Sequence, residues 1–162
     1  MLRCTMQKPL PTLGPRGRLR EEALYRPRHV VLVADPALPQ SALLRPGLRA
    51  LGQGSVGICV PAIGLNASLA HLAPQPGKLA LICQSSALAR AVLDWAEAES
   101  VGFSHVIGIG GNADLGFAHA LDWLSRDPGT AAILLDIRRI KNRRQFVSAA
   151  RAAARTRPVV AI

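Results

Sequence analysis

From Lys78 onward, short apolar runs alternate with longer stretches in which apolar residues recur at helical spacing. The runs of strand type cover residues 79–83, 105–109, 131–137 and 158–162. The helical stretches cover residues 87–100, 115–125 and 142–155. Strands that alternate with helices at this rhythm predict parallel βαβ units with right-handed crossovers. The expected fold class is therefore α/β: a three-layer parallel sheet with helices on both faces.

The first of these helices shows how the pattern assigns faces. An apolar stripe and a charged stripe lie on opposite sides of it. The predicted buried stripe holds Leu88, Ala91, Val92, Trp95 and Ala96.

The part of the chain before Lys78 is less regular. Residues 1–27 contain four prolines and two glycines and are expected to form an irregular lead. The apolar runs at 29–34 and 55–60 predict strands, residues 41–51 a short helix that Pro46 and Gly47 interrupt, and residues 62–77 a loop. The predicted organisation has three parts, 1–27, 28–77 and 78–162.

Composition favours a reduced, cytoplasmic protein. Apolar residues make up 49% of the 162 residues but aromatic ones only 4%, so Ala, Leu, Val and Ile have to build the core. We find no apolar run of about 18 residues that would span a membrane, and no signal-peptide pattern. Cys4, Cys59 and Cys83 are far apart and form no CxxC pair, which indicates buried thiols and no metal site.

The formal net charge is +10, and its densest cluster comprises Arg138, Arg139, Lys141, Arg143 and Arg144. Such a cluster attracts nucleic acid or polyphosphate, or it is only the solvated face of a helix. Because no aromatic residues are interleaved to stack bases, nucleic acid is the less favoured ligand. A phosphate-bearing small molecule or another anionic metabolite remains compatible with the cluster.

The candidate ligand site lies where the strand at 79–83 ends, because open α/β sheets bind ligands at the carboxyl ends of their strands. Gln84, Ser85, Ser86 and Ala87 lead directly from that strand into a helix. Hydroxyls and free N–H groups at a helix N-terminus suit a phosphate or a carboxylate. The plainer alternative is that a serine serves only as the N-cap.

A second strand end carries Gly110, Gly111 and Asn112, but no GxGxxG fingerprint. We interpret it as a turn that brings the backbone close to a neighbouring segment, followed by Asp114 as an N-cap. The histidines at positions 29, 71, 105 and 119 have no recognisable partner, so no catalytic residue is assigned.

Several motifs in order resemble the NDP-forming acyl-CoA ligases. The chain looks like the second, flavodoxin-like domain of the ADP-forming acetyl-CoA synthetases, which also occurs in the ligase-like half of bacterial protein lysine acetyltransferases. The resemblance covers about residues 55–162, and residues 24–33 resemble the start of the CoA-binding domain that precedes it. The motifs are Gly64-Leu-Asn-Ala-Ser-Leu-Ala-His71, Pro76-Gly-Lys-Leu-Ala-Leu-Ile-Cys-Gln-Ser-Ser-Ala-Leu88, Leu93-Asp-Trp95, Val101-Gly-Phe-Ser104, Asp127-Pro128, Ile133-Leu-Leu135 and Arg157-Pro-Val-Val160.

The resemblance implies a flavodoxin-like fold for 78–162 and a shortened remnant of a Rossmann-type CoA-binding domain in 28–77. It places Ser85 and Ser86 at the turn whose helix N-terminus stabilises a phosphohistidine in the family. Arg138 stands where the family commonly has Glu, and it is able to pair with a phosphate instead. The turn at 110–114 lacks the family's lysine, and none of the four histidines matches the phosphohistidine motif, which is expected beyond this chain.

Three functions follow as expectations. The first is an NDP-forming acyl-CoA ligase domain that is not an autonomous catalyst and acts with an ATP-grasp-type partner subunit, with CoA or phosphate implied as ligands only by the resemblance. The second is a non-enzymatic module that binds a metabolite or a protein. The third is a fragment of a protein lysine acetyltransferase. The last strand is expected at a sheet edge, so a homo-oligomer is a further possibility.

Overall fold

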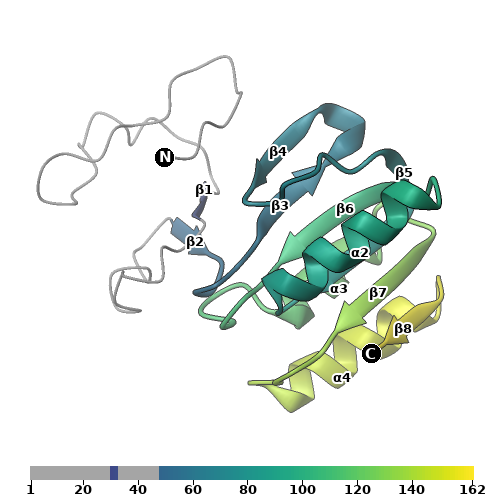
Figure 1. Cartoon of the computed structure of the whole chain (residues 1–162). Helices are drawn as coiled ribbons and strands as arrows, with labels where there is room; N and C mark the ends of the chain where they lie inside the picture. The colour runs from purple at the N-terminus through teal and green to yellow at the C-terminus, as the bar shows by residue number, and fades with distance from the viewer. Residues whose placement is uncertain (1–29, 33–47) are drawn as a thin grey trace, which may run out of the picture.

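The computed structural model describes residues 30–32 and 48–162. A six-stranded sheet with strand order β4-β3-β6-β5-β7-β8 forms its centre (Figure 1). In chain order the elements are β1 (Val30–Leu32), β2 (Leu48–Ala50), β3 (Gly57–Val60), the 3-10 turn η2 (Pro61–Ile63), β4 (Leu65–Ser68), β5 (Pro76–Cys83), α2 (Ser86–Ala98), β6 (Phe103–Gly108), α3 (Phe117–Leu124), β7 (Ala132–Asp136), α4 (Arg143–Ala154) and β8 (Val159–Ala161).

The four strands predicted from Lys78 onward pair in parallel, in the order β6-β5-β7-β8. Helix α2 covers one face of the sheet, and α3 and α4 lie together on the other (Figure 1). The three-layer α/β fold with helices on both faces is thus confirmed. The physical basis is the apolar strand run, which is buried on both faces and therefore needs a helix on each side.

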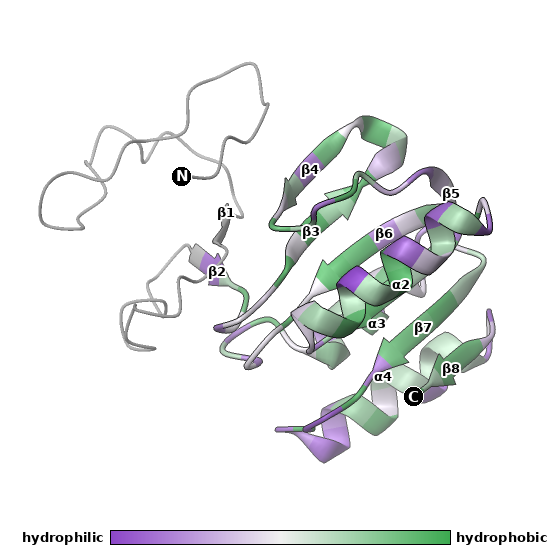
Figure 2. Ribbon diagram, viewed as in Figure 1, coloured by the Kyte–Doolittle hydropathy of each residue, from purple (hydrophilic) through white to green (hydrophobic). Residues whose placement is uncertain are grey.

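Two hydrophobic clusters fill the spaces between the layers. Successive side chains of a strand point to opposite faces, so Leu81 packs towards α2 while Ala80 and Ile82 pack towards α3 and α4. Figure 2 shows the same division, with hydrophobic colour on β6 and β7 and hydrophilic residues on the outward side of α2.

The predicted stripe of α2 is only partly correct: Ala96 is buried and Leu88 and Val92 are half-buried, but Ala91 and Trp95 are exposed. The buried residues are Ala89, Leu93 and Ala96, whereas the Trp95 side chain is 56% exposed. Five of the 13 residues of α2 are alanines, which are small enough for either an exposed or a buried position, so the boundary of the buried face was not fixed by the pattern alone.

The segment before β5 departs most from the prediction. The loop expected at 62–77 contains β4, which pairs antiparallel with β3 after a turn at Gly64, where φ is +67°. Strand β3 also pairs antiparallel with β6, so two strands from the range 28–77 extend the same sheet as the later strands. The proposed division of the chain at residue 78 stays a prediction.

The strand expected at 29–34 is present as β1, and it pairs in parallel with β2. The helix expected at 41–51 is wrong for its described end, because residues 48–50 are strand β2; residues 41–47 lie outside the described ranges. Tertiary contacts account for this strand. Ala50 is fully buried, its N–H donates to the Asp114 carboxylate and its carbonyl accepts from the Leu115 N–H.

Candidate anion site at the carboxyl edge of the sheet

Three strand ends meet at one edge of the sheet. The last residue of β5, Cys83, is in register with Gly108 of β6 on one side and with Asp136 of β7 on the other. The three segments that follow these strands are therefore neighbours, and they contain every site residue that the sequence analysis proposed. This edge is where an open α/β sheet places its ligands.

The Asp136 carboxylate organises the β5–α2 turn. The residue is only 6% exposed, and its Oδ2 accepts hydrogen bonds from the N–H groups of Gln84 (3.2 Å) and Ser85 (2.8 Å). Two backbone donors of the turn are therefore already used within the protein. Asp136 was not among the site residues predicted from the sequence, although its place at the end of a buried apolar strand could have indicated it.

Gln84 joins all three segments. Its Oε1 accepts from the N–H groups of Arg138 and Arg139, both at 2.7 Å, and its Nε2 donates to the Gly110 carbonyl at 3.4 Å. Both ends of the amide are thus occupied by backbone groups. Gln84 shapes the edge by holding the β6 and β7 loops against the start of α2.

Ser85 is the N-cap of α2. Its backbone is extended (φ −91°, ψ 119°), its Oγ accepts from the Leu88 N–H at 3.2 Å, and the residue is 8% exposed. Ser86 and Ala87 are the first two residues of the helix, and the N–H groups at these positions have no partner within a helix. The donors left for an anion are thus those of Ser86 and Ala87.

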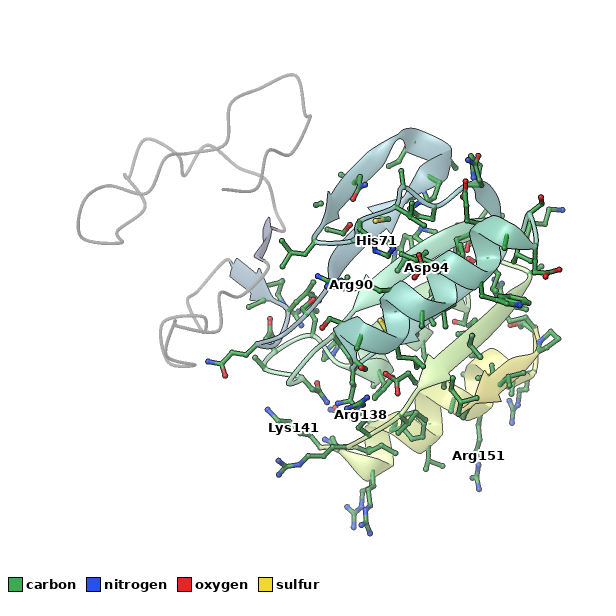
Figure 3. All side chains as sticks on the ribbon, viewed as in Figure 1. His71, Arg90, Asp94, Arg138, Lys141 and Arg151 are labelled. Atoms are coloured by element: carbon green, nitrogen blue, oxygen red, sulfur yellow. The ribbon has the colours of Figure 1, made fainter. Side chains whose placement is uncertain are left out.

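Positive charge surrounds this helix end. The Arg138 side chain is 66% exposed, and its Nε lies 3.9 Å from Oδ1 of Asp136. Arg139 and Lys141 follow on the same exposed segment, where Figure 3 shows Arg138 and Lys141. The one nearby thiol contributes no nucleophile, since burial and the negative charge of Asp136 raise the pKa of Cys83 to about 12.

The Gly110 turn belongs to the frame of the site. Gly110 has a φ of +49°, and a Cβ at this position would lie 2.4 Å from the Gln53 carbonyl oxygen. Gly111 donates to the same carbonyl at 2.8 Å, and Asn112 also has a positive φ, +56°. The predicted close approach of this turn to a neighbouring backbone is confirmed.

Asp114 is not an N-cap, because α3 begins after Gly116. Its carboxylate accepts instead from Arg49 Nε (2.8 Å) and from the Ala50 N–H (3.1 Å). Burial alone would raise the pKa of Asp114, but these hydrogen bonds and the charges of Arg49 and His119 together lower it. Asp114 thus anchors β2 to the loop that follows β6.

The histidines of the described ranges all lie in other contacts; His29 is outside those ranges. His71 Nε2 is 2.6 Å from the Asp94 carboxylate on the surface of α2, where Figure 3 shows the two side chains pointing towards each other. His119 accepts weakly from the Gly116 N–H, and His105 is buried beside Asp127. The pairing of His71 with Asp94 was not visible in the sequence, because the two residues are 23 positions apart.

Cys59 and Cys83 are free and buried, as predicted, while Cys4 lies outside the described ranges. Within residues 30–32 and 48–162, no cluster of three or more His, Cys, Asp or Glu side chains is arranged to hold a metal ion. Over the same part of the chain, no helix combines the length and the apolar character required to cross a membrane.

The sheet is mixed, but its strands β6, β5, β7 and β8 are parallel and have helices on both faces, an arrangement consistent with a flavodoxin-like domain. The family described as the succinyl-CoA ligase-like flavodoxin domain matches residues 76–162, and the chain belongs to this family.

Two of the relatives that the chain matches are ADP-forming acetate–CoA ligases. The chain is 34% identical over 116 residues to an ADP-forming acetate–CoA ligase of Archaeoglobus fulgidus, a match that covers 72% of this chain and 17% of the relative. It is also 34% identical over 116 residues to the alpha subunit of such a ligase from Pyrococcus furiosus, covering 72% of this chain and 25% of that subunit.

Among solved structures, the acetyl-coenzyme A synthetase 1 of Ca. Korarchaeum cryptofilum, in complex with phosphate and ADP, superposes with a TM-score of 0.68 at 30% identity. That match covers 72% of this chain and 25% of the synthetase chain. The chain thus spans a quarter or less of the relatives it matches here.

Proposed function

We propose that this chain provides the flavodoxin-like domain of an NDP-forming acyl-CoA ligase and holds an anionic phosphoryl group at the N-terminus of α2. The proposal rests on which backbone N–H groups at the start of α2 already have a partner within the protein and which do not. Asp136 takes the N–H groups of Gln84 and Ser85, and Ser85 Oγ takes that of Leu88. The N–H groups of Ser86 and Ala87 remain available to a ligand, and they lie at the positive end of a 13-residue helix.

The remaining residues fit a phosphate on one side of the turn. The exposed guanidinium of Arg138 lies beside the turn, and Arg139 and Lys141 extend the positive charge. The Asp136 carboxylate opposes an anion, so the ligand belongs on the Ser86 side, away from Oδ2. Gln84 and Ser85 then act as frame residues, and Ser86, Ala87 and Arg138 as contact residues.

The domain is not proposed as an autonomous catalyst. The Ser86 turn has no hydrogen bond to any of the three described histidines, each of which has contacts elsewhere. The similarity to a ligase alpha subunit supports a second chain, of ATP-grasp type, that supplies the nucleotide site. CoA and the acyl group would then be bound by the assembly as a whole.

A thermal-shift measurement with inorganic phosphate tests the anion site. At a concentration about ten times Kd, binding stabilises the folded state by about 1.4 kcal/mol. For a chain of this size that raises Tm by about 3–6 °C. Chloride at equal ionic strength separates binding of a phosphate-like anion from a general salt effect.

Ser86→Pro is the most specific variant. Proline is compatible with the first position of a helix, and the extended Ser85 before it suits the residue that precedes a proline. The change removes the Ser86 N–H and the hydroxyl together, whereas Ser86→Ala removes only the hydroxyl. We expect the phosphate shift to be lost in Ser86→Pro, reduced in Arg138→Gln and largely retained in Ser86→Ala. An unchanged shift in Ser86→Pro would refute the site.

The dependence on a partner has its own test. Acetyl-CoA, ADP and phosphate incubated with the purified chain should yield no ATP. Formation of ATP by the chain alone would contradict the proposal that catalysis depends on a partner chain. It would not bear on the anion site, which the thermal-shift measurement tests separately.

A further inference from the structure

The outward face of α4 forms a second charged surface, apart from the carboxyl edge. Arg143, Arg144, Arg151 and Arg155 are all exposed there. None of these four guanidinium groups forms an ion pair or a hydrogen bond with the described residues, and α4 contains no acidic residue. Figure 3 shows Arg151 pointing away from the body of the domain.

The centre of this face is apolar. Val147 is 43% exposed, and Ser148 and Ala152 lie beside it. Together with the four arginines they line an open, shallow depression along the outward side of α4. Arg143, Val147 and Arg151 follow one another at intervals of four residues, so they share one side of the helix about 6 Å apart, and the whole stripe extends about 18 Å.

The negative end of the helix dipole favours Arg151 and Arg155 at the C-terminal end of α4, but the fold does not account for the two arginines at its N-terminal end. Helix α4 is held to the domain by its opposite side, where Ala153 is buried and Phe146 packs edge-to-face on Phe117. Arg143 and Arg144 occupy the first turn, where the positive end of the helix dipole disfavours cations. Four like charges without carboxylates also repel one another.

We propose that this α4 face docks an acidic amphipathic helix of a partner protein. Carboxylates spaced by four residues would pair with the guanidinium groups, and a stripe of small apolar residues would cover Val147 and Ala152. Single-stranded nucleic acid is the less suitable occupant because the face has no aromatic side chain for stacking, and duplex DNA is compared in the test below. A second copy is unsuitable because a symmetric contact would oppose arginine to arginine. The inference is independent of the anion site.

Fluorescence anisotropy with a labelled acidic peptide tests the docking surface. The probe is an 18-residue helical peptide with Glu at four-residue intervals and an Ala/Leu stripe. The test variant, Arg144→Glu with Arg151→Glu, should weaken binding by about tenfold or more, and raising the salt from about 50 to 300 mM should also weaken it. Val147→Ala should weaken binding about threefold, because the apolar centre contributes.

The matched control is Lys78→Glu with Arg90→Glu. Both double variants lower the formal net charge from +10 to +6, but Lys78 and Arg90 are exposed on β5 and α2. The control should retain the affinity within about twofold, since surface charges away from the contact are largely screened. Circular dichroism verifies that each variant is folded. If Arg144→Glu with Arg151→Glu does not fold, the neutral double variant Arg144→Gln with Arg151→Gln takes its place.

Three results would overturn the proposal. The first is no binding of the peptide, and the second is equal weakening by the two double variants. The third is tighter binding of a DNA duplex of equal charge through Arg144 and Arg151, which would make the face a nucleic-acid surface.

Discussion

Removal of the Asp136 carboxylate should loosen the whole carboxyl edge. In Asp136→Ala the N–H groups of Gln84 and Ser85 lose their acceptor, and the Ser85 residue is 8% exposed. Each buried donor left without an acceptor lowers the free energy of unfolding by about 1–3 kcal/mol. The loss lies towards the upper end of this range when the missing acceptor was charged. Because Gln84 is only half-buried, we expect a total loss of about 3 kcal/mol in the free energy of unfolding.

Urea unfolding followed by circular dichroism measures this loss. Asp136→Asn should cost only about 1 kcal/mol, since its amide oxygen can still accept both N–H groups without the charge. Asp94→Ala is the matched control. It removes a carboxylate that is 58% exposed and paired with His71 on the surface, so it should cost less than about 1 kcal/mol. An Asp136→Ala protein as stable as the wild type would refute the assigned role of this carboxylate.

Three further predictions concern other parts of the described structure. Burial lowers the pKa of His105, and the charge of Asp127 only partly offsets this, so the unfolded chain binds more protons as the pH falls below about 6.5. The urea midpoint should therefore drop between pH 8 and pH 5 more in the wild type than in His105→Gln; equal drops would contradict this. Gly110→Ala should cost about 2–3 kcal/mol in urea unfolding, because its φ of +49° and the nearby Gln53 carbonyl exclude a Cβ. Gly111→Ala, with more than 3.5 Å of clearance, should be nearly neutral, and equal costs for the two would argue against the steric reason. The Cys83 thiol, with a pKa of about 12, should resist a thiol-specific reagent at pH 8 until the domain unfolds, and rapid labelling in the native state would contradict its burial.

The sequence suffices to propose the segments of the candidate site but not the hydrogen bonds that connect them. The strand-to-helix transition at Gln84 to Ala87 is a local pattern, and the start of α2 at Ser86 follows from it. That Asp136 captures two of the turn's N–H groups is a contact between residues more than 50 positions apart. A local sequence pattern does not predict which backbone N–H group will donate a hydrogen bond to a carboxylate far away in the sequence.

The sequence by itself determined the alternation of elements from β5 to β8, since apolar runs of strand length and helical periodicity are properties of neighbouring residues. It also predicts a candidate site at the end of β5, and that site stays a prediction. The tertiary structure decided which strands lie beside one another, and so brought Gln84, Gly110 and Arg138 together at one edge. It also turned residues 65–68 into strand β4 and residues 48–50 into β2. Strand pairing and buried hydrogen bonds between distant segments outweighed weak local preferences in those two places.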